Sequence, residues 1–397
     1  MTAEILPPPS TAIGPRAWLR ENLFSGIGSS IATGLIAGLL IVIAIRIGDW
    51  AVTEARWEVV TRNMRLLLIG QYPGDQAWRL WLSLLMLSAL TGVSAAVFGR
   101  TARTLAVAVS AFQLLLAGLT VVSPVGPLIS VGLLVNAIVV WVGVVVGQRV
   151  GIPRRALLLA WIASIPLTWV LLTGIGETAV PAVGSHLWGG LLLTILLAAV
   201  GIVISFPIGV LLALGRRSTM PAVRLVCTAY IELIRAVPLV TILFMADIML
   251  PFFLPGEVRI DRVTRAMGGI ALFSAAYVAE NVRGGLQALP TGQIEAAHAL
   301  GLNTFQTNLF IVLPQALRAV IPANVGLFIS LLKDTTLVSI IGLSELLGIG
   351  RAILAQPNSL GAHMEVFAFT AVIFFVLCYA MSQASYRLER SLGVGTR

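Results

Sequence analysis

Long apolar stretches recur along the whole chain, separated by short polar or basic segments. The stretches are continuously apolar and do not alternate with a period of two, so they predict helices rather than the strands of a β-barrel. A helix that crosses about 30 Å of hydrocarbon needs about 20 residues. About ten stretches meet this requirement, near 26–45, 80–98, 104–122, 127–147, 156–173, 188–214, 236–254, 266–286, 319–341 and 364–384. The pattern predicts an all-α, polytopic membrane protein of about ten transmembrane helices.

Composition supports this class and excludes several others. Of 397 residues, 58% are hydrophobic and only 11% are charged, with a mean hydropathy of +0.97. A soluble domain carries about 25% charged residues, so this chain cannot cover a water-facing surface. A soluble enzyme, a coiled coil and a disordered protein are therefore excluded. The net charge of +9 does not indicate nucleic acid, because the basic residues cluster between the apolar stretches.

These basic clusters predict how the chain is oriented in the membrane. They occupy alternate connecting segments and both ends of the chain, at Arg16 and Arg20, Arg100 and Arg103, Arg149 to Arg155, Arg216 to Arg224, and Arg387 to Arg397. Basic loops stay in the cytoplasm, so an even number of spans places both termini there. The arginines of segments 48–79 and 255–265 run against this assignment.

The two halves of the chain differ in character. We expect a cytoplasmic N-terminal tail at 1–25 and an N-terminal membrane extension of about five helices at 26–180, with few polar residues. Gln113 and Asn136 are exceptions in the extension, and we expect them to form an interhelical hydrogen bond. The second half, 186–392, carries patterned polar residues, and no internal repeat relates the halves.

A mixed polar stretch follows the eighth apolar stretch. Glu295-Ala296-Ala297 begins a short predicted helix that ends at Gly301, where glycine favours a positive φ. A second amphipathic piece, 305–312, leads to Leu313-Pro314. We expect an elbow of two short helices on the cytoplasmic side. Its small alanines permit close approach of a partner, and Glu295 can anchor that partner.

The spacing of this elbow resembles a known signature. Glu295-Ala296-Ala297, three residues, Gly301, nine residues, Ile311, one residue and Leu313-Pro314 resemble the EAA loop of membrane subunits of bacterial ABC importers. Four further phrases resemble the polar amino-acid uptake branch, at 231–238, 277–285, 292–293 and 332–337. The long N-terminal half is similar to that of the longer permease subunit of broad-specificity L-amino-acid importers.

The resemblance implies a fold and a function. It implies a type I ABC importer permease core of about five helices within 186–392, with an ATPase-coupling loop at about 288–314. The coupling residues are then Glu295, Ala296, Ala297, Gly301, Leu313 and Pro314. The implied function is a permease subunit that moves L-amino acids from a periplasmic binding protein across the bacterial inner membrane. The implied partners are ABC ATPase subunits, a second homologous permease subunit that completes a heterodimer, and the periplasmic amino-acid-binding protein.

The chain lacks the motifs of an enzyme. A P-loop requires Gly-x-x-x-x-Gly-Lys-Ser/Thr, but Lys333 is the only lysine and follows Leu332. His186, His298 and His363 are far apart, so no metal site is predicted. We therefore expect no cofactor on this chain, with ATP and Mg²⁺ used by the partner ATPase.

Four charged residues within or beside apolar stretches are candidates for the substrate pathway: Asp247, Glu280, Lys333 and Asp334. A charge at mid-membrane costs about 2.5–3.5 kcal/mol, so each should face protein or a wet cavity. Arg283 can neutralise Glu280, whereas Asp247 has no basic residue three or four positions away. Asp247 is therefore the residue expected to be unpaired. Structural pairing is the alternative role for both carboxylates.

Glu232 and Arg235 are three residues apart and are expected to pair with each other.

The alternative function is an ion- or proton-coupled secondary amino-acid transporter that acts without an ATPase. Such transporters are built from inverted repeats with matching broken helices. The unequal polarity of the two halves favours the importer instead.

Overall fold

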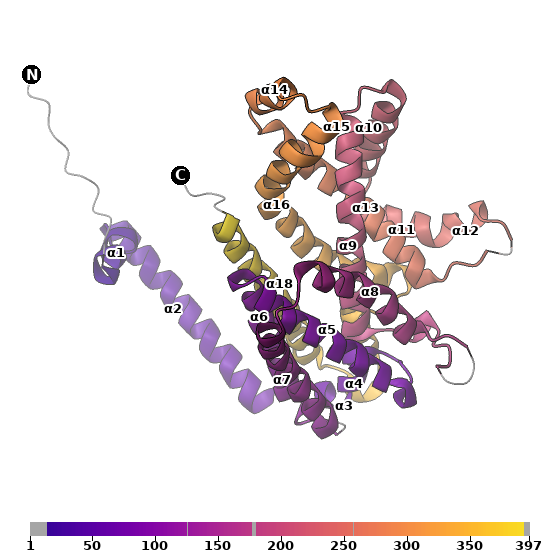
Figure 1. Cartoon of the computed structure of the whole chain (residues 1–397). Coiled ribbons are helices and arrows are strands. Elements are labelled where there is room, and N and C mark those ends of the chain that lie inside the picture. Colours follow the sequence, from indigo (N-terminus) through magenta and orange to yellow (C-terminus); the bar gives the residue numbers. More distant parts are fainter. Residues whose placement is uncertain (1–13, 125, 177–179, 257, 393–397) are drawn as a thin grey trace, which may run out of the picture. The chain divides into compact units, whose positions relative to one another are not determined.

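A computed structural model describes residues 14–124, 126–176, 180–256 and 258–392 (Figure 1). The chain divides into two units, Met1–Arg56 and Trp57–Arg397. The described residues are almost entirely helical, and their β-pairing is confined to two isolated bridges, Gly70 with Trp188 and Gly190 with Glu345. The predicted all-α class is confirmed.

The first unit consists of α1 (Pro15–Asn22), α2 (Ile27–Asp49) and the π-helical turn η1 (Trp50–Glu54). No residue of α2 is buried within the chain, although the helix is 23 residues long and apolar on all sides. A helix of this kind is stable where lipid or another protein surrounds it. Helix α1 lies within the predicted tail, and residues 1–13 of that tail lie outside the described part of the chain.

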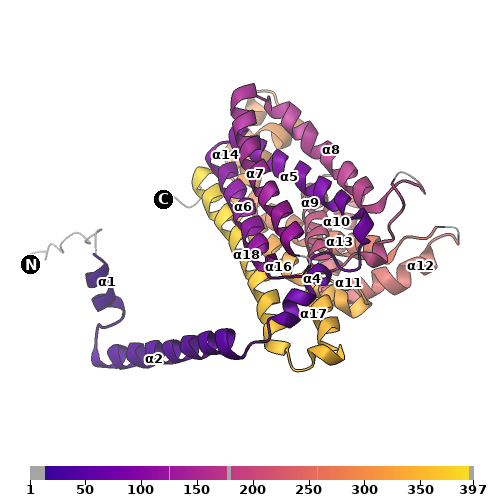
Figure 2. The same ribbon diagram turned by 90° about the horizontal axis from the view of Figure 1, so that it is seen from below.

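The second unit begins with short helices and continues as a helical bundle. The short elements are α3 (Glu58–Arg62), α4 (Met64–Ile69) and η2 (Gly74–Gln76). The bundle comprises α5 (Trp78–Val97), α6 (Arg100–Thr120), α7 (Gly126–Val150) and α8 (Arg154–Thr173). Helix α5 packs against the other three, and Figure 2 shows them side by side. A Cβ added to Gly92 would lie 1.9 Å from the Val140 carbonyl oxygen, so α5 and α7 approach too closely for a larger residue.

A buried chain of polar side chains joins three helices of this bundle. Gln113 of α6 donates from Nε2 to Ser88 Oγ of α5 at 2.9 Å. Ser88 Oγ in turn donates to Asn136 Oδ1 of α7 at 3.4 Å. The expected interhelical role of Gln113 and Asn136 is confirmed, with Ser88 as the bridge between them.

The rest of the second unit is a helical core with an elbow. Its elements are η3 (Ser185–Leu187), α9 (Gly190–Arg216), α10 (Pro221–Ala236), α11 (Leu239–Phe244), η4 (Met245–Met249), α12 (Leu250–Phe253), α13 (Arg262–Gln287), α14 (Thr291–Ala299), α15 (Thr304–Gln306), η5 (Thr307–Val312), α16 (Leu313–Asp334), η6 (Thr335–Ile341), α17 (Leu346–Leu354), η7 (Pro357–Ser359) and α18 (His363–Leu392). Helix α13 is central, because it packs against α9, α10, α11 and α16.

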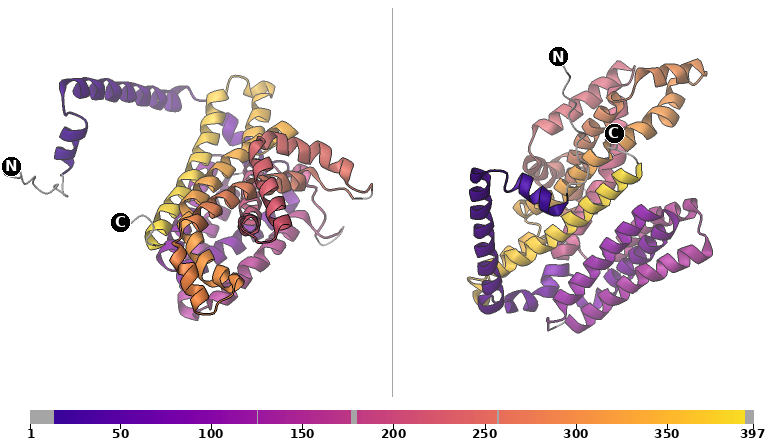
Figure 3. Two further views of the ribbon diagram at one scale, coloured as in Figure 1. Left: turned by 90° about the horizontal axis from the view of Figure 1, so that it is seen from above. Right: turned by 90° about the vertical axis from the view of Figure 1, so that its left-hand side faces the viewer.

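The bundle and the core share apolar surfaces. Met64 and Leu67 of α4 are fully buried in a cluster that also contains Leu191 of α9, Leu346 of α17 and Phe369 of α18. Helix α18 contacts both α6 and α16, and it lies between the bundle and the core in Figure 3. The N-terminal bundle is therefore packed onto the core rather than joined to it by a linker alone.

Each of the ten predicted stretches lies in a described helix or in the bent helix pair, but the helix that holds one of them, α13, is not counted among the candidate spans. Eight helices are long and apolar enough to cross a membrane, or nine if α10 and α11–α12, which are bent by 108°, form one span. The bend falls at Val237-Pro238, where proline cannot donate the helical hydrogen bond. The remaining predicted stretch, 266–286, forms part of α13. That helix has 26 residues but is less apolar, since it carries Arg262, Arg265, Glu280 and Arg283.

Candidate functional site

The elbow lies at the C-terminal end of α13. Three residues, Ala288 to Pro290, separate α13 from α14, and Figure 1 shows α14 and α15 together at this end of the core. Pro290 has the extended backbone (φ −61°, ψ 134°) from which the new helix starts. Helix α14 contains Glu295, Ala296 and Ala297, so the predicted short helix is confirmed.

A glycine turn reverses the chain after α14. Gly301 has φ +81°, as the sequence predicts. Its N–H donates to the His298 carbonyl at 2.9 Å, and the Leu302 N–H donates to the Ala297 carbonyl at 3.1 Å. No atom lies within 4 Å of the position that a Cβ would take. A side chain here would therefore be opposed by backbone strain and not by a clash.

The segment after the turn is also fixed locally. Asn303 caps α15 by accepting from the Gln306 N–H at 2.9 Å, while the Gln306 side chain accepts from the Asn303 N–H at 3.0 Å. This reciprocal pair is a capping box, which satisfies two helix-end donors. The chain then runs through η5 into α16, where Leu313 is half-buried and Pro314 is exposed.

The inner side of the elbow is packed onto the core. Ala297 of α14 is 4% exposed, and Val312 and Ala316 lie in one apolar cluster with Val282 and Leu286 of α13. Gln315 of α16 donates to the Gln293 Oε1 of α14 at 2.6 Å. A movement of α14 would therefore be transmitted directly to α13 and α16.

The outer side of the elbow carries groups that suit a protein partner. Glu295 and Ala296 are exposed, as the sequence predicts. Leu300 is 83% and Phe305 is 72% exposed. Large exposed apolar side chains beside polar ones are typical of a surface that another protein covers. We call Glu295, Leu300 and Phe305 the elbow surface.

A network of charged residues ties three core helices together at the same end. The Glu280 carboxylate of α13 accepts from Arg283 Nε at 3.0 Å. It also lies 3.3 Å from Arg235 of α10 and 3.4 Å from Arg216 of α9. The expected neutralisation of Glu280 by Arg283 is confirmed. The network reaches the elbow through Arg283, which donates to the Gln287 side chain at 2.6 Å near the end of α13.

The expected pair between Glu232 and Arg235 is wrong. Glu232 pairs with Arg216 at 2.8 Å, and Arg235 pairs with Glu280. The Glu280 side chain is 21% exposed, whereas that of Glu232 is 56% exposed. Solvent screens the Glu280 carboxylate less than the Glu232 carboxylate. Glu280 therefore attracts Arg235 more strongly than Glu232 does, although Glu232 is on the same helix as Arg235. Arg216 and Arg235 thus belong to a site that local sequence spacing did not reveal.

The expectation that Asp247 is unpaired is also wrong. Its Oδ1 lies 3.1 Å from Arg262 Nε and 3.2 Å from an Arg265 guanidinium nitrogen, and its side chain is 10% exposed. Both arginines are on the first turn of α13, 15 and 18 residues further along the chain. A search three or four positions away cannot find such partners. The sequence signal that could have indicated these partners is the spacing of Arg262 and Arg265, which are three residues apart and so lie on one face of α13.

The four candidate pathway residues are not brought together. Glu280 lies about 27 Å along α13 from Arg262, the partner of Asp247, at 1.5 Å per residue. Lys333 and Asp334 end α16 where the backbone changes to the 3-10 helix η6. Lys333 is exposed and Asp334 is half-buried, and the ion pairs of the described residues include neither. Within the described part of the chain, no group of three His, Cys, Asp or Glu side chains could hold a metal ion.

Comparisons with known proteins match both the core and the whole chain. Residues 205–394 match the family described as "Binding-protein-dependent transport system inner membrane component". The chain is 36% identical to the inner membrane amino-acid ABC transporter permease protein YhdY of Escherichia coli, over 98% of this chain and 96% of that one. It is 38% identical to the glutamate/glutamine/aspartate/asparagine transport system permease protein BztC of Rhodobacter capsulatus, over 97% and 95% of the two chains.

Shorter relatives match only part of the chain. The probable glutamine ABC transporter permease protein GlnP of Bacillus subtilis is 36% identical over 52% of this chain and 93% of its own. A crystal structure of an amino acid ABC transporter with histidines is 32% identical, covers 51% of this chain and 92% of that one, and has a TM-score of 0.46. YhdY and BztC thus match nearly the whole chain, whereas GlnP matches about half of it.

Proposed function

The chain belongs to the family of ABC transporter permease proteins of the bacterial inner membrane, and from this premise we propose that it is the permease subunit of an ATP-driven importer of L-amino acids. In this role it is a transport subunit and not an enzyme. A periplasmic binding protein delivers the amino acid, and the chain releases it to the cytoplasm. The names of YhdY and BztC support amino acids as the substrate class.

The elbow is the observation that carries the proposal. The elbow surface projects beyond the packed inner side of α14, and the turn at Gly301 sets its direction. We propose that a cleft of the ATPase receives this surface. ATP and Mg²⁺ act on the ATPase, and the Gln293–Gln315 hydrogen bond and the Glu280 network pass the resulting movement to α9, α10, α13 and α16.

The proposal includes further partners and an orientation. A second, homologous permease subunit completes the path through the membrane, so that the two chains form a heterodimer. The elbow faces the cytoplasm, and both termini lie on the same side as the elbow. Reporter fusions that are active only in the cytoplasm test this at the N-terminus and the C-terminus. A fusion at the N-terminus that is active only in the periplasm would contradict the orientation.

The alternative is an ion- or proton-coupled secondary transporter that acts without an ATPase. It leaves the exposed Leu300 and Phe305 without a role, because a transporter that works alone needs no docking surface for a motor subunit.

Co-purification tests the proposal. The tagged chain is expressed with its ATPase, extracted in mild detergent, and the bound proteins are identified by mass spectrometry. We expect the ATPase to co-purify with the wild type and to be lost from the double variant Leu300→Ser, Phe305→Ser. Phe252 and Phe253 of α12 are 82% and 77% exposed and lie away from the elbow, so Phe252→Ser, Phe253→Ser is the matched control. Equal recovery of the ATPase with both double variants would contradict docking at the elbow.

A further inference from the structure

The short helix α1 of the first unit has one apolar side. Trp18 is 50% exposed and Leu19 is 43% exposed. Adjacent residues are about 100° apart around a helix, so these two side chains cover one side of α1. Arg20 follows Trp18 by two residues and is exposed about 160° away from it. Helix α1 is therefore amphipathic, and about half of its apolar side is open to a partner.

Helix α2 determines where α1 lies relative to a membrane. Its 23 residues rise about 35 Å, which is enough to cross a hydrocarbon core of about 30 Å. Helix α2 is a candidate span, and none of its residues is buried within the chain. Its first residue, Ile27, therefore lies at the edge of the hydrocarbon. Only the turn from Leu23 to Gly26 separates Ile27 from the end of α1.

Hydrogen bonds hold the corner between the two helices. The Leu23 N–H donates to the Leu19 carbonyl at 2.9 Å, which closes the last turn of α1. The Leu23 carbonyl accepts from Thr33 Oγ1 of α2 at 2.8 Å. Thr33 lies about 9 Å along α2 from Ile27, at 1.5 Å per residue. The C-terminal end of α1 is thus held beside the second turn of α2, and Figure 2 shows α1 turned away from the axis of α2.

A phospholipid surface fits this arrangement. An interfacial helix lies in the plane of the membrane and buries its apolar side about 5–10 Å into the boundary between headgroups and acyl chains. The bond to Thr33 holds α1 at this boundary. Tryptophan suits it, because the ring is apolar and the indole N–H can donate. An arginine on the other side, such as Arg20, can reach outward and donate to phosphate oxygens.

We propose that α1 is an interfacial anchor, with Trp18 and Leu19 inserted among lipid acyl chains and Arg20 at the headgroup phosphates. The anchor lies in the leaflet at the N-terminal end of α2, which is the cytoplasmic leaflet in the orientation proposed above. Eight residues alone would bind a membrane weakly, but α2 tethers them there, so that their binding is intramolecular. The anchor goes beyond the importer function and does not depend on it.

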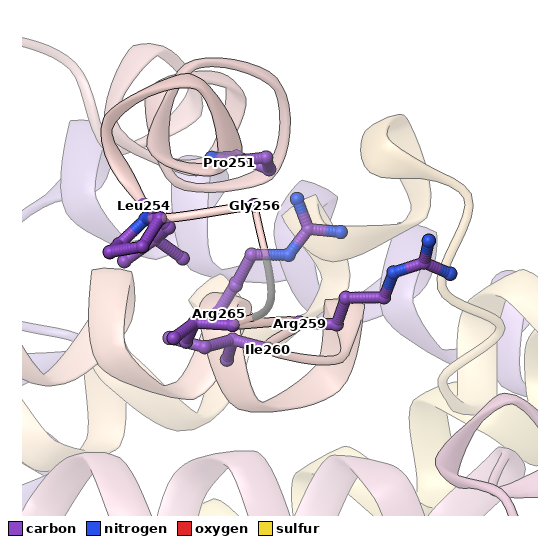
Figure 4. A pocket seen from close by; sticks show the side chains of 8 residues that line it. Pro251, Leu254, Gly256, Arg259, Ile260 and Arg265 are labelled. Carbon is purple, nitrogen blue, oxygen red and sulfur yellow. The ribbon is translucent and has the colours of Figure 1, made fainter.

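A fluorescent label that reports contact with lipid tests the anchor. Single cysteines are introduced into a chain that carries Cys227→Ser and Cys378→Ser, and they are labelled with a nitrobenzoxadiazole reagent. Leu19→Cys places the label on the apolar side of α1. Ala17→Cys is the matched control, because Ala17 is exposed about 160° away from Leu19 on the same helix. Arg259→Cys gives the signal of a label in water, since Arg259 is exposed beside a cavity of about 320 Å³ between α12 and α13 (Figure 4).

The labelled importer is reconstituted in vesicles of phosphatidylethanolamine and phosphatidylglycerol, with or without phosphatidylglycerol that is brominated in the upper part of its acyl chains. We expect the Leu19→Cys label to emit at a shorter wavelength than the Arg259→Cys label and to lose intensity when the brominated lipid is present. The Ala17→Cys label should emit like the Arg259→Cys label and keep its intensity. Trp18→Cys repeats the measurement from the apolar side if Leu19→Cys does not assemble.

Three outcomes would overturn the anchor. A Leu19→Cys label that behaves like the Arg259→Cys label would place α1 in water. Equal quenching of the Leu19→Cys and Ala17→Cys labels would mean that α1 does not present one side to lipid. Emission at a shorter wavelength without quenching would mean that a protein, such as the second permease subunit, covers the apolar side. None of these outcomes bears on ATP-driven uptake, so the anchor and the importer function are tested separately.

Discussion

Arg235 of α10 and Glu280 of α13 lie 3.3 Å apart at the end of the core that carries the elbow. The same carboxylate also contacts Arg216 of α9 and Arg283 of its own helix. One acidic side chain therefore links three helices at the end of the core that carries the elbow, where a movement of the elbow would enter the core.

Replacement of Glu280 tests this link. Glu280→Gln leaves three guanidinium groups around an uncharged side chain, and we expect a loss on the order of 1–3 kcal/mol in stability. The thermal melting temperature of the detergent-solubilised importer reports the change. Glu232→Gln is the matched control, because Glu232 is 56% exposed and, among the described residues, forms its ion pair with Arg216. It should cost less than about 1 kcal/mol. Equal melting temperatures for the two variants would show that Glu280 does not hold the helices together.

The turn at Gly301 allows a second test. A β-branched residue opposes the left-handed backbone by about 1–2 kcal/mol, whereas asparagine tolerates that backbone. Gly301→Val should therefore reduce transport and substrate-stimulated ATP hydrolysis about tenfold, with membrane insertion unchanged. Gly301→Asn should retain most activity. If Gly301→Val transported at the wild-type rate, the elbow conformation would not be needed for coupling.

Because Asp247 is paired with two arginines, its replacement should lower the stability of the protein rather than its affinity for substrate. Asp247→Asn leaves Arg262 and Arg265 without their shared carboxylate, so we expect a lower melting temperature. The double variant Asp247→Asn, Arg262→Gln removes one of the unpaired charges and should recover part of the loss. A substrate contact would give the opposite pattern, in which uptake weakens while the melting temperature is unchanged. Melting curves and uptake kinetics of the three proteins distinguish the two roles.

The sequence predicts best where the signal is local. The helix at Glu295, the positive φ of Gly301 and the hydrogen-bonding role of Gln113 follow from neighbouring residues or from the cost of a polar group in lipid. Segment 48–79 shows the limit, because we expected a connecting loop. Its apolar pieces are too short for a span, yet Met64 and Leu67 are fully buried against the core.

The charged clusters could not be predicted for a related reason. Glu280 meets Arg216 from 64 positions away in the sequence, and Asp247 meets Arg265 from 18 positions away. Only the packing of α13 against α9, α10 and α11 decides these partners. Arg79 of α5 is a further case. Its fully buried guanidinium donates at 2.8 Å to the carbonyl of Pro181, which lies 102 positions later in the sequence, between α8 and η3.

ATP-driven uptake is the most direct test of the central claim. The chain, its partner permease and the ATPase are reconstituted in proteoliposomes, and uptake of radiolabelled L-glutamate, L-glutamine and L-histidine is followed with the binding protein outside. The importer account predicts uptake that requires enclosed ATP and Mg²⁺ and the binding protein, and that persists when ionophores collapse every ion gradient. Uptake that needs an ion gradient and continues without the ATPase would contradict the account and establish the secondary transporter.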